Sequence, residues 1–184
     1  MLKPGGIIEN YILSEQLGRK GWYIETWRAT DKHGFDVIVK LHHTTVHDDY
    51  DSQRHDLTQK IAEILPQIEH LVSLPSMPGV ASWLRYHFEP DRRYLILCRR
   101  HYPDRLADRF PVNPTGARNR GPEPDFLEAF QEIAKAVDLL QENIAETIPI
   151  VPSNLLMEGS QAYLADFGLE KLHDLIEQGY AGPG

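Results

Sequence analysis

The stretch PSNLLMEGSQAYLADFGL, at residues 152–169, contains two strand-length apolar runs joined by a short polar connector. Runs of this length around turn residues are typical of a β-hairpin. Asn154 would lie at the start of the hairpin and Asp166 at its end, and both side chains carry the oxygen ligands that magnesium prefers. The stretch therefore predicts a hairpin with a candidate metal site at its open end.

The overall composition is that of an ordinary globular chain, with 41% apolar and 25% charged residues among 184. This length suits one domain or two small lobes. A formal net charge of -8 disfavours a nucleic-acid partner, because phosphate-binding surfaces cluster Lys and Arg. The single cysteine, Cys98, excludes an internal disulfide and fits a reducing compartment. With no membrane-length apolar run and no signal-peptide pattern, we expect a cytoplasmic protein without a membrane segment.

A second hairpin is predicted near the N-terminus. Two β-prone runs, one reaching Leu17 and one starting near Ile24, flank a segment that contains Gly18 and Gly21. Glycines in such a loop allow the backbone to approach a ligand closely. A plain hairpin with an aromatic tip explains the same residues, and this alternative stays open.

The run VIVKL at residues 37–41 predicts a strand with Lys40 embedded in it. A lysine inside an apolar strand is unfavourable unless its charge is paired. It is interpreted either as an edge-strand charge that limits aggregation or as a ligand-binding cation. The next four histidines lack the spacing of a metal site and are interpreted as a solvated loop: His42, His43, His47 and His55.

Two amphipathic helices are predicted. The first contains Pro66 and has apolar residues at three- and four-residue intervals: Leu57, Ile61, Ile64, Leu65, Ile68 and Leu71. The second follows a Pro- and Gly-rich linker at residues 111–124 and starts at Asp125, with Glu128 as a capping-box partner. Its expected apolar face is Phe126, Phe130, Ile133, Ala134, Val137, Leu140 and Ile144. A hairpin of residues 80–88 and 94–98 lies between the helices.

The order of these motifs resembles that of the eukaryotic-type serine/threonine protein kinases. In that family, a catalytic-loop asparagine and the D-F-G aspartate hold magnesium on ATP, and Asn154 and Asp166 match these positions. Lys40 matches the strand lysine that contacts the phosphates, and Glu63 is the candidate for its ion-pair partner on the αC helix. The resemblance spans residues 10–172. It implies an α+β, protein-kinase-like fold, with an N-lobe antiparallel sheet and αC helix plus the beginning of a helical C-lobe.

The resemblance also implies an ATP site. Its nucleotide-binding residues would be Leu17, Gly18, Gly21, Thr26, Ile38, Lys40, Leu97, Cys98, Arg100, Asn154, Leu156 and Asp166. The backbone from Cys98 to Arg100 would bind the adenine edge as the hinge, with Leu97 behind it. The family's H-R-D triplet falls on residues 147–149, so Pro149 occupies the place of the catalytic aspartate and no catalytic residue is predicted.

The kinase pattern implies three segments: an N-lobe and hinge at residues 1–102, a short helix and loop at 103–124, and a partial C-lobe with a polar tail at 125–184. No A-P-E segment or later C-lobe helix follows the D-F-G motif. The helix that starts at Asp125 matches the family's αE, and we therefore expect a protein partner, or the missing part of a C-lobe, to cover its apolar face. The expected function is that of a nucleotide-binding pseudokinase in signalling. A weakly active serine/threonine kinase and a nucleotide-free protein-interaction module are the alternatives.

Overall fold

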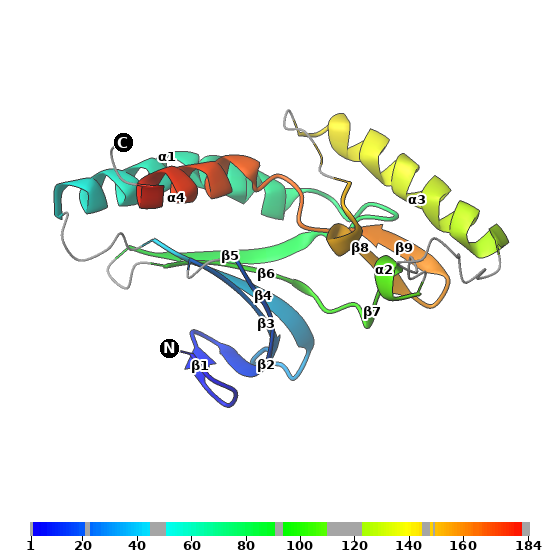
Figure 1. The fold of residues 1–184 in the computed structure, drawn as a ribbon, viewed down its shortest axis with the longest axis horizontal. Coiled ribbons are helices and arrows are strands. Elements are labelled where there is room, and N and C mark those ends of the chain that lie inside the picture. Colours follow the sequence, from blue (N-terminus) through cyan, green and yellow to red (C-terminus); the bar gives the residue numbers. More distant parts are fainter. Residues whose placement is uncertain are drawn as a thin grey trace. The chain divides into compact units, whose positions relative to one another are not determined.

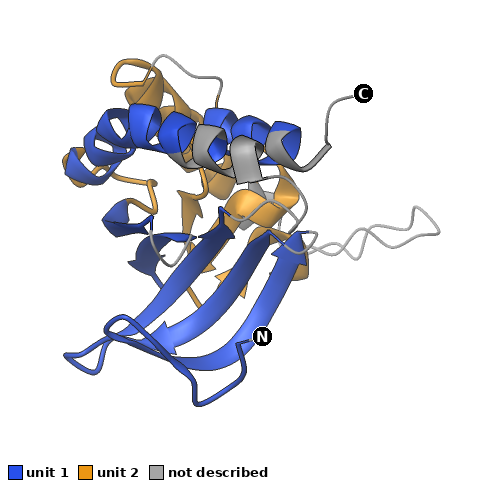
Figure 2. Cartoon of the chain, turned by 90° about the vertical axis from the view of Figure 1, so that its left-hand side faces the viewer, with its two compact units in different colours: residues 1–73, 83–101, 170–184 blue, residues 74–82, 102–169 orange. Residues whose placement is uncertain are grey.

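The computed structural model describes residues 2–20, 23–44, 51–90, 94–109, 123–144, 148 and 150–181. The chain divides into two compact units (Figure 2). The first consists of residues 1–73, 83–101 and 170–184, and the second of residues 74–82 and 102–169. The chain passes from the first unit to the second between residues 101 and 102, and returns to the first unit at Glu170.

In the described part of the first unit, a six-stranded antiparallel sheet has the order β1-β2-β3-β4-β6-β5. Its strands are β1 (Ile7–Ile8), β2 (Tyr11–Lys20), β3 (Ile24–Thr30), β4 (Asp36–His43), β5 (Trp83–Glu89) and β6 (Tyr94–Arg100). The predicted N-terminal hairpin, the lysine-bearing strand and the hairpin that follows the first helix are all confirmed. The histidine prediction is wrong in part, because His42 and His43 are the last residues of strand β4.

The two faces of this sheet are covered differently. Large apolar side chains from five strands form a core on one face, among them Tyr11, Leu13, Trp27, Val39, Leu41, Ile96 and Cys98. On the opposite face, the rings of His42 in β4 and His173 in α4 (Glu170–Ala181) are 5.5 Å apart. Helix α4 lies beside α1 (Asp51–Ser73), which in turn contacts β5 (Figure 1). The sheet is therefore buried on both faces, which explains the nearly continuous apolar runs of β4 and β6.

Helix α1 follows the predicted apolar periodicity. Leu57, Ile61, Ile64, Ile68 and Leu71 are all buried. Ile61 and Ile68 are at most 2% exposed, and burying a side chain of this size contributes about 1.5–3 kcal/mol. The helix continues through Pro66 to Ser73.

Helix α4 replaces the polar tail that was expected after the D-F-G motif. Leu172 and Ile176 are buried and lie four residues apart, on one face of the helix. Together with Leu169, which is also buried, they form a short helical periodicity. The tail prediction was wrong because this three-residue pattern is outnumbered by charged and polar neighbours.

The described residues of the second unit form a three-stranded sheet in the order β7-β8-β9. Its strands are β7 (Asp104–Arg105), β8 (Leu155–Glu158) and β9 (Gln161–Leu164), accompanied by α2 (Leu106–Arg109), α3 (Glu123–Gln141) and the 3-10 turn η1 (Pro152–Asn154). The β8–β9 hairpin confirms the prediction from residues 152–169. Across the helices that the structure describes in both units, none combines the length and apolar character that a membrane crossing requires.

Helix α3 packs on β9 through a face that shares Ile133 and Leu140 with the predicted one but is otherwise rotated from it. Its buried residues are Ala129, Ile133, Ala136 and Leu140, whereas Phe130 is 42% exposed. The reason is close packing, because a Cβ added at Gly79 would lie only 3.2 Å from the Cβ of Ala136. Small side chains therefore face the sheet. The helix also begins at Glu123, two residues before the predicted cap.

Candidate functional site

The first half of the predicted nucleotide site is a row of residues across the large sheet. Gly18 of β2 pairs with Thr26 of β3, Thr26 pairs with Lys40 of β4, and Lys40 pairs with Leu97 of β6. Directly paired residues of antiparallel strands project to the same face. Four of the predicted residues thus share one face of the first unit, although they span 79 positions between Gly18 and Leu97.

Two further predicted residues flank this row. Leu17 lies where the β2–β3 register shifts between Gln16 and Gly18, so it is the extra residue of a β-bulge. Bulges re-aim side chains and are frequent beside binding sites. Ile38 lies two residues before Lys40 in β4, on the same face, and is 2% exposed.

The predicted hinge needs a correction at Cys98. Strand β6 lies between β4 and β5, and Cys98 pairs with Val39 on one side and Arg85 on the other. Its backbone is therefore used within the sheet, and its side chain belongs to the core of the opposite face. Burial raises the pKa of the Cys98 thiol, which keeps it protonated.

Strand β6 ends at Arg100. This exposed residue pairs with Val37 of β4 and lies beyond the β5 register, which ends at the Trp83–Arg99 pair. Arg99, which sequence reasoning left out of the site, pairs with Ile38 and so lies on the face that carries Lys40. Arg99 is only 6% exposed and donates a hydrogen bond from Nη1 to the carbonyl of Arg100, at 3.1 Å.

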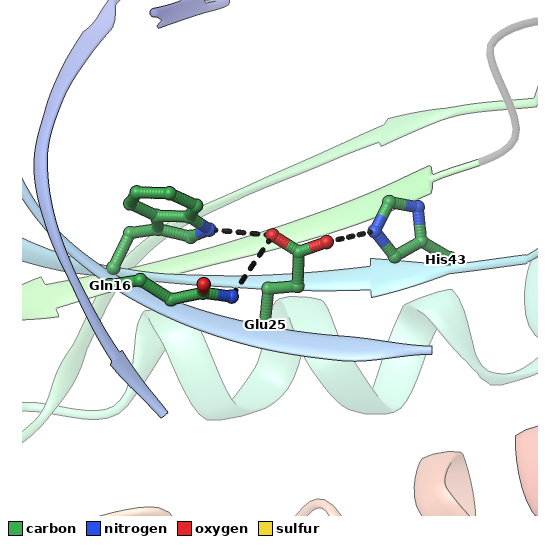
Figure 3. A network of polar contacts seen from close by, with 4 residues as sticks. Gln16, Glu25 and His43 are labelled. Atoms are coloured by element: carbon green, nitrogen blue, oxygen red, sulfur yellow. Dashed lines mark hydrogen bonds and ion pairs between the residues drawn. The ribbon is translucent and has the colours of Figure 1, made fainter. Parts of the chain in front are cut away.

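A buried carboxylate joins neighbouring strands close to the tip of the β2–β3 hairpin. Figure 3 shows Glu25 of β3 between Gln16 and His43. The Glu25 carboxylate accepts a hydrogen bond from Trp27 Nε1 at 2.8 Å and one from Gln16 Nε2 at 3.4 Å. Its second oxygen lies 3.2 Å from His43 Nε2. Three strands are therefore joined through one acid.

Glu25 directly precedes Thr26, which belongs to the row of Gly18, Thr26, Lys40 and Leu97, called here the Lys40 row. The Glu25 contacts therefore help to position the site. The Glu25 side chain is 5% exposed, and a carboxylate this buried is tolerated only when donors satisfy its oxygens. Sequence reasoning missed this residue. The available signal was an acid between Ile24 and Thr26 in a β-prone run, but two of its three partners, Gln16 and His43, lie on other strands.

The second half of the predicted site lies at the open end of the β8–β9 hairpin. The Ala165 amide donates to the carbonyl of Asn154 at 2.8 Å, one step beyond the Leu155–Leu164 pair. This bond places Asn154 beside the residue that precedes Asp166. The two candidate metal ligands, which are twelve positions apart in the sequence, are therefore brought together within one unit.

Asp166 has an unusual backbone conformation, with a φ of 58°. A left-handed conformation at a residue with a Cβ costs about 1–3 kcal/mol and persists where surrounding structure imposes it. Phe167, which follows it, is completely buried, and Gly168 is also left-handed, with a φ of 71°. The D-F-G turn is thus anchored by its phenylalanine.

Leu156 of β8 stabilises this hairpin through apolar packing. It is 4% exposed and packs in a small cluster with Ala81 and Ala165. Tyr102 and Tyr163 pack against the same cluster, with ring centroids 4.5 Å apart. Leu156 is therefore a core residue of the second unit.

Three predicted residues remain: Glu63, Gly21 and Pro149. Glu63 is exposed on α1, on the side away from the buried stripe. Gly21 and Pro149 lie outside the described residues. Among the residues that the structure describes, no group of three or more His, Cys, Asp or Glu side chains is arranged to hold a metal ion. A magnesium site of the kind predicted would instead rely on one carboxylate, one amide and the ligand's own oxygens.

Comparisons with known proteins agree at the level of fold. No protein-family model matches the sequence, and no curated protein does. Among solved structures, the chain is similar to the apo form of PpkA-294, a bacterial Ser/Thr kinase, with a TM-score of 0.69 and 16% sequence identity. The match covers 97% of this chain and 66% of that chain. The chain therefore has a kinase-like fold and spans about two thirds of the similar structure.

Proposed function

We propose that this kinase-like chain binds ATP with magnesium and acts as a pseudokinase, with impaired or absent phosphoryl transfer. The observation that carries the proposal is the arrangement at the open end of the β8–β9 hairpin. The Ala165–Asn154 hydrogen bond joins the backbone of Asn154 to the residue that precedes Asp166, and the left-handed backbone of Asp166 supports a functional role for this turn. Strain at a residue with a Cβ is a feature of functional sites.

Each half of the site would have its own task. Lys40, in the Gly18–Thr26–Lys40–Leu97 row, would contact the phosphates as a point charge. Asn154 and Asp166 would supply oxygen ligands to magnesium, which usually binds one or two protein oxygens together with phosphates and water. Magnesium would neutralise phosphate charge on the nucleotide.

Phosphoryl transfer is expected to be weak because of Pro149. A proline side chain can neither accept a proton nor orient a substrate hydroxyl. General-base catalysis typically contributes about 10²–10⁴ in rate. A transfer assay with a generic serine or threonine substrate should therefore show activity reduced by that order or more. A weakly active kinase is the alternative within this proposal.

A thermal-shift titration with ATP, with and without magnesium, tests the nucleotide site. A ligand that binds only the folded state, at one hundred times its dissociation constant, stabilises that state by about 2.7 kcal/mol. We expect a magnesium-dependent shift that Lys40→Ala and Asp166→Asn both abolish. Lys32→Ala and Asp138→Asn remove the same charges at exposed positions and should retain the shift. No shift with any well-folded variant would contradict the proposal.

One observation favours a second function, a nucleotide-free interaction module. The buried Arg99 side chain lies opposite Ile38 on the face of Lys40, and we infer that it competes with a planar base for this face. Under this alternative, ATP produces no shift in the wild-type protein. An Arg99→Ala variant that gains ATP binding would show that Arg99 is what excludes the nucleotide.

A further inference from the structure

The tip of the β2–β3 hairpin is held by an acid from helix α4. Glu177 accepts hydrogen bonds from Lys20 Nζ and from the hydroxyl of Tyr23, the latter at 3.1 Å. Lys20 is the last residue of β2, and Tyr23 comes directly before β3. One carboxylate of the C-terminal helix therefore binds both strand ends of the hairpin that carries Gly18.

Strand register places this contact next to the Lys40 row. Lys20 pairs with Ile24, and Ile24 pairs with His42, so these three side chains share a face. Gly18, Thr26 and Lys40 form the neighbouring row on that same face, two residues further along each strand. Two residues of strand correspond to about 7 Å, a distance that a polyphosphate chain can span.

Helix α4 packs over the row formed by Lys20, Ile24 and His42. Leu172 and Ile176 are buried, and His173 lies against His42. The exposed Glu177 directly follows this anchored stretch, so the helix can present its carboxylate without itself moving. The contact with Lys20 lowers the pKa of Glu177 and raises that of Lys20, so both groups are charged at neutral pH.

We propose that Lys20 and Tyr23 form an anion site that Glu177 fills from within the chain, in competition with the terminal phosphates of a nucleoside triphosphate bound at Lys40. A cation and a hydroxyl are suitable donors for a phosphate oxygen. The Glu177 carboxylate occupies both donors and repels a second anion. Helix α4 therefore lowers the affinity of the site for polyphosphates. This inference rests on the proposed nucleotide site for its ligand class.

The size of the effect follows from the exposure of the pair. The side chains of Lys20 and Glu177 are 58% and 44% exposed, so solvent screens their attraction. Exposed ion pairs contribute at most about 1 kcal/mol, which corresponds to about a fivefold change in affinity. Glu177→Gln should raise ATP affinity by up to that factor, raise ADP affinity less, and leave adenosine affinity unchanged.

Isothermal titration with ATP and with inorganic tripolyphosphate tests the inference on wild type, Glu177→Gln and Glu69→Gln. Glu69 is exposed on α1, so its variant controls for the loss of one negative charge. Tighter ATP and tripolyphosphate binding only in Glu177→Gln supports the inference. Tighter tripolyphosphate binding without any ATP binding would retain the anion site at Lys20 and Tyr23 but sink the proposed nucleotide site, and with it the competition at Lys40.

Other results would overturn the inference. Equal ATP affinity in wild type and Glu177→Gln would show that Glu177 does not compete, while the nucleotide site itself would stand. No binding of either ligand to any variant would remove both proposals. Adding Lys20→Ala to Glu177→Gln should return the affinity to the wild-type value or below. A double variant that keeps the full gain would show that Lys20 is not the competing donor.

Discussion

The two units hold their candidate site residues by different means. In the first unit, long paired strands set the Lys40 row, and the side chain of Glu25 joins three strands through its hydrogen bonds. In the second unit the strands are short, and the chain direction is set by left-handed backbone conformations at Gly79, Gly159 and Asp166. The first unit should therefore be sensitive to the loss of a side-chain acceptor, and the second to changes at special backbone positions.

The largest expected effect is at Glu25. Glu25→Ala leaves the buried indole of Trp27, and the part-buried donor of Gln16, without their acceptor, which should lower the free energy of unfolding by about 2–4 kcal/mol. Urea denaturation measures the change. Glu15→Ala, at an exposed position of β2, is the control and should change stability by less than about 0.5 kcal/mol. Equal losses in the two variants would refute the difference between the units.

A glycine pair probes the second unit. A Cβ at Gly79 would lie 3.1 Å from the Glu132 carbonyl oxygen, whereas none of the neighbouring atoms lies within 4 Å of a Cβ at Gly159. Both glycines are left-handed. Gly159→Ala should therefore cost only the backbone strain, about 1–2 kcal/mol, and Gly79→Ala should cost about 1–3 kcal/mol more through overpacking. Similar unfolding midpoints for the two variants would argue against tight packing of α3 on β9.

A smaller effect on stability is expected at Asp166, where two variants distinguish the role of the backbone conformation from that of the carboxylate. Asp166→Ala and Asp166→Gly both remove the carboxylate, but only glycine adopts the observed φ of 58° without strain. The glycine variant should be more stable than the alanine variant by about 1 kcal/mol. Thermal unfolding of the two purified variants measures this difference. An alanine variant of equal or greater stability would show that the left-handed conformation is not imposed on this position.

The smallest effect is expected in acid, at a turn of the first unit. The amides of Phe35 and His33 donate to the Asp31 carboxylate and lower its pKa below the ordinary 3.8. Its stabilising contribution is complete above pH 3.8 and is lost as the pH falls through the folded-state pKa. Asp31→Asn should therefore lose less stability than wild type between about pH 4 and pH 2. Parallel pH-dependent denaturation curves would contradict this role.

Much of the fold was readable from local patterns. The β8–β9 hairpin, the Lys40 strand and helix α1 each carry their own periodicity or turn residues, and each was found where predicted. The α3 face was misjudged because Ala129 and Ala136 pack closely on the sheet, whereas the larger Phe130 is exposed. Helix α4 was missed because Leu172 and Ile176 are too few to stand out among polar residues.

The candidate site was less accessible from sequence. In β6, the run LILCRR is buried on both faces up to Arg99, so alternation does not reveal that Leu97 and Arg99 share the Lys40 face while Cys98 faces the opposite core. The Glu25 donors come from three strands, and the Glu177 contact joins residues more than 150 positions apart. Such contacts depend on register and tertiary packing, which no local pattern encodes.

The division of the chain also has a consequence for synthesis. The first unit takes its last element, α4, from beyond the whole of the second unit. The buried Leu172 and Ile176 leave the ribosome only after every strand of the second unit. Domains tend to fold as they emerge from the ribosome. The second unit would therefore be complete first, and the surface of α1 would stay uncovered until α4 has been synthesised. Contacts between such distant segments are slow to form. The apolar surface of α1 that α4 covers should therefore stay accessible to chaperones during translation.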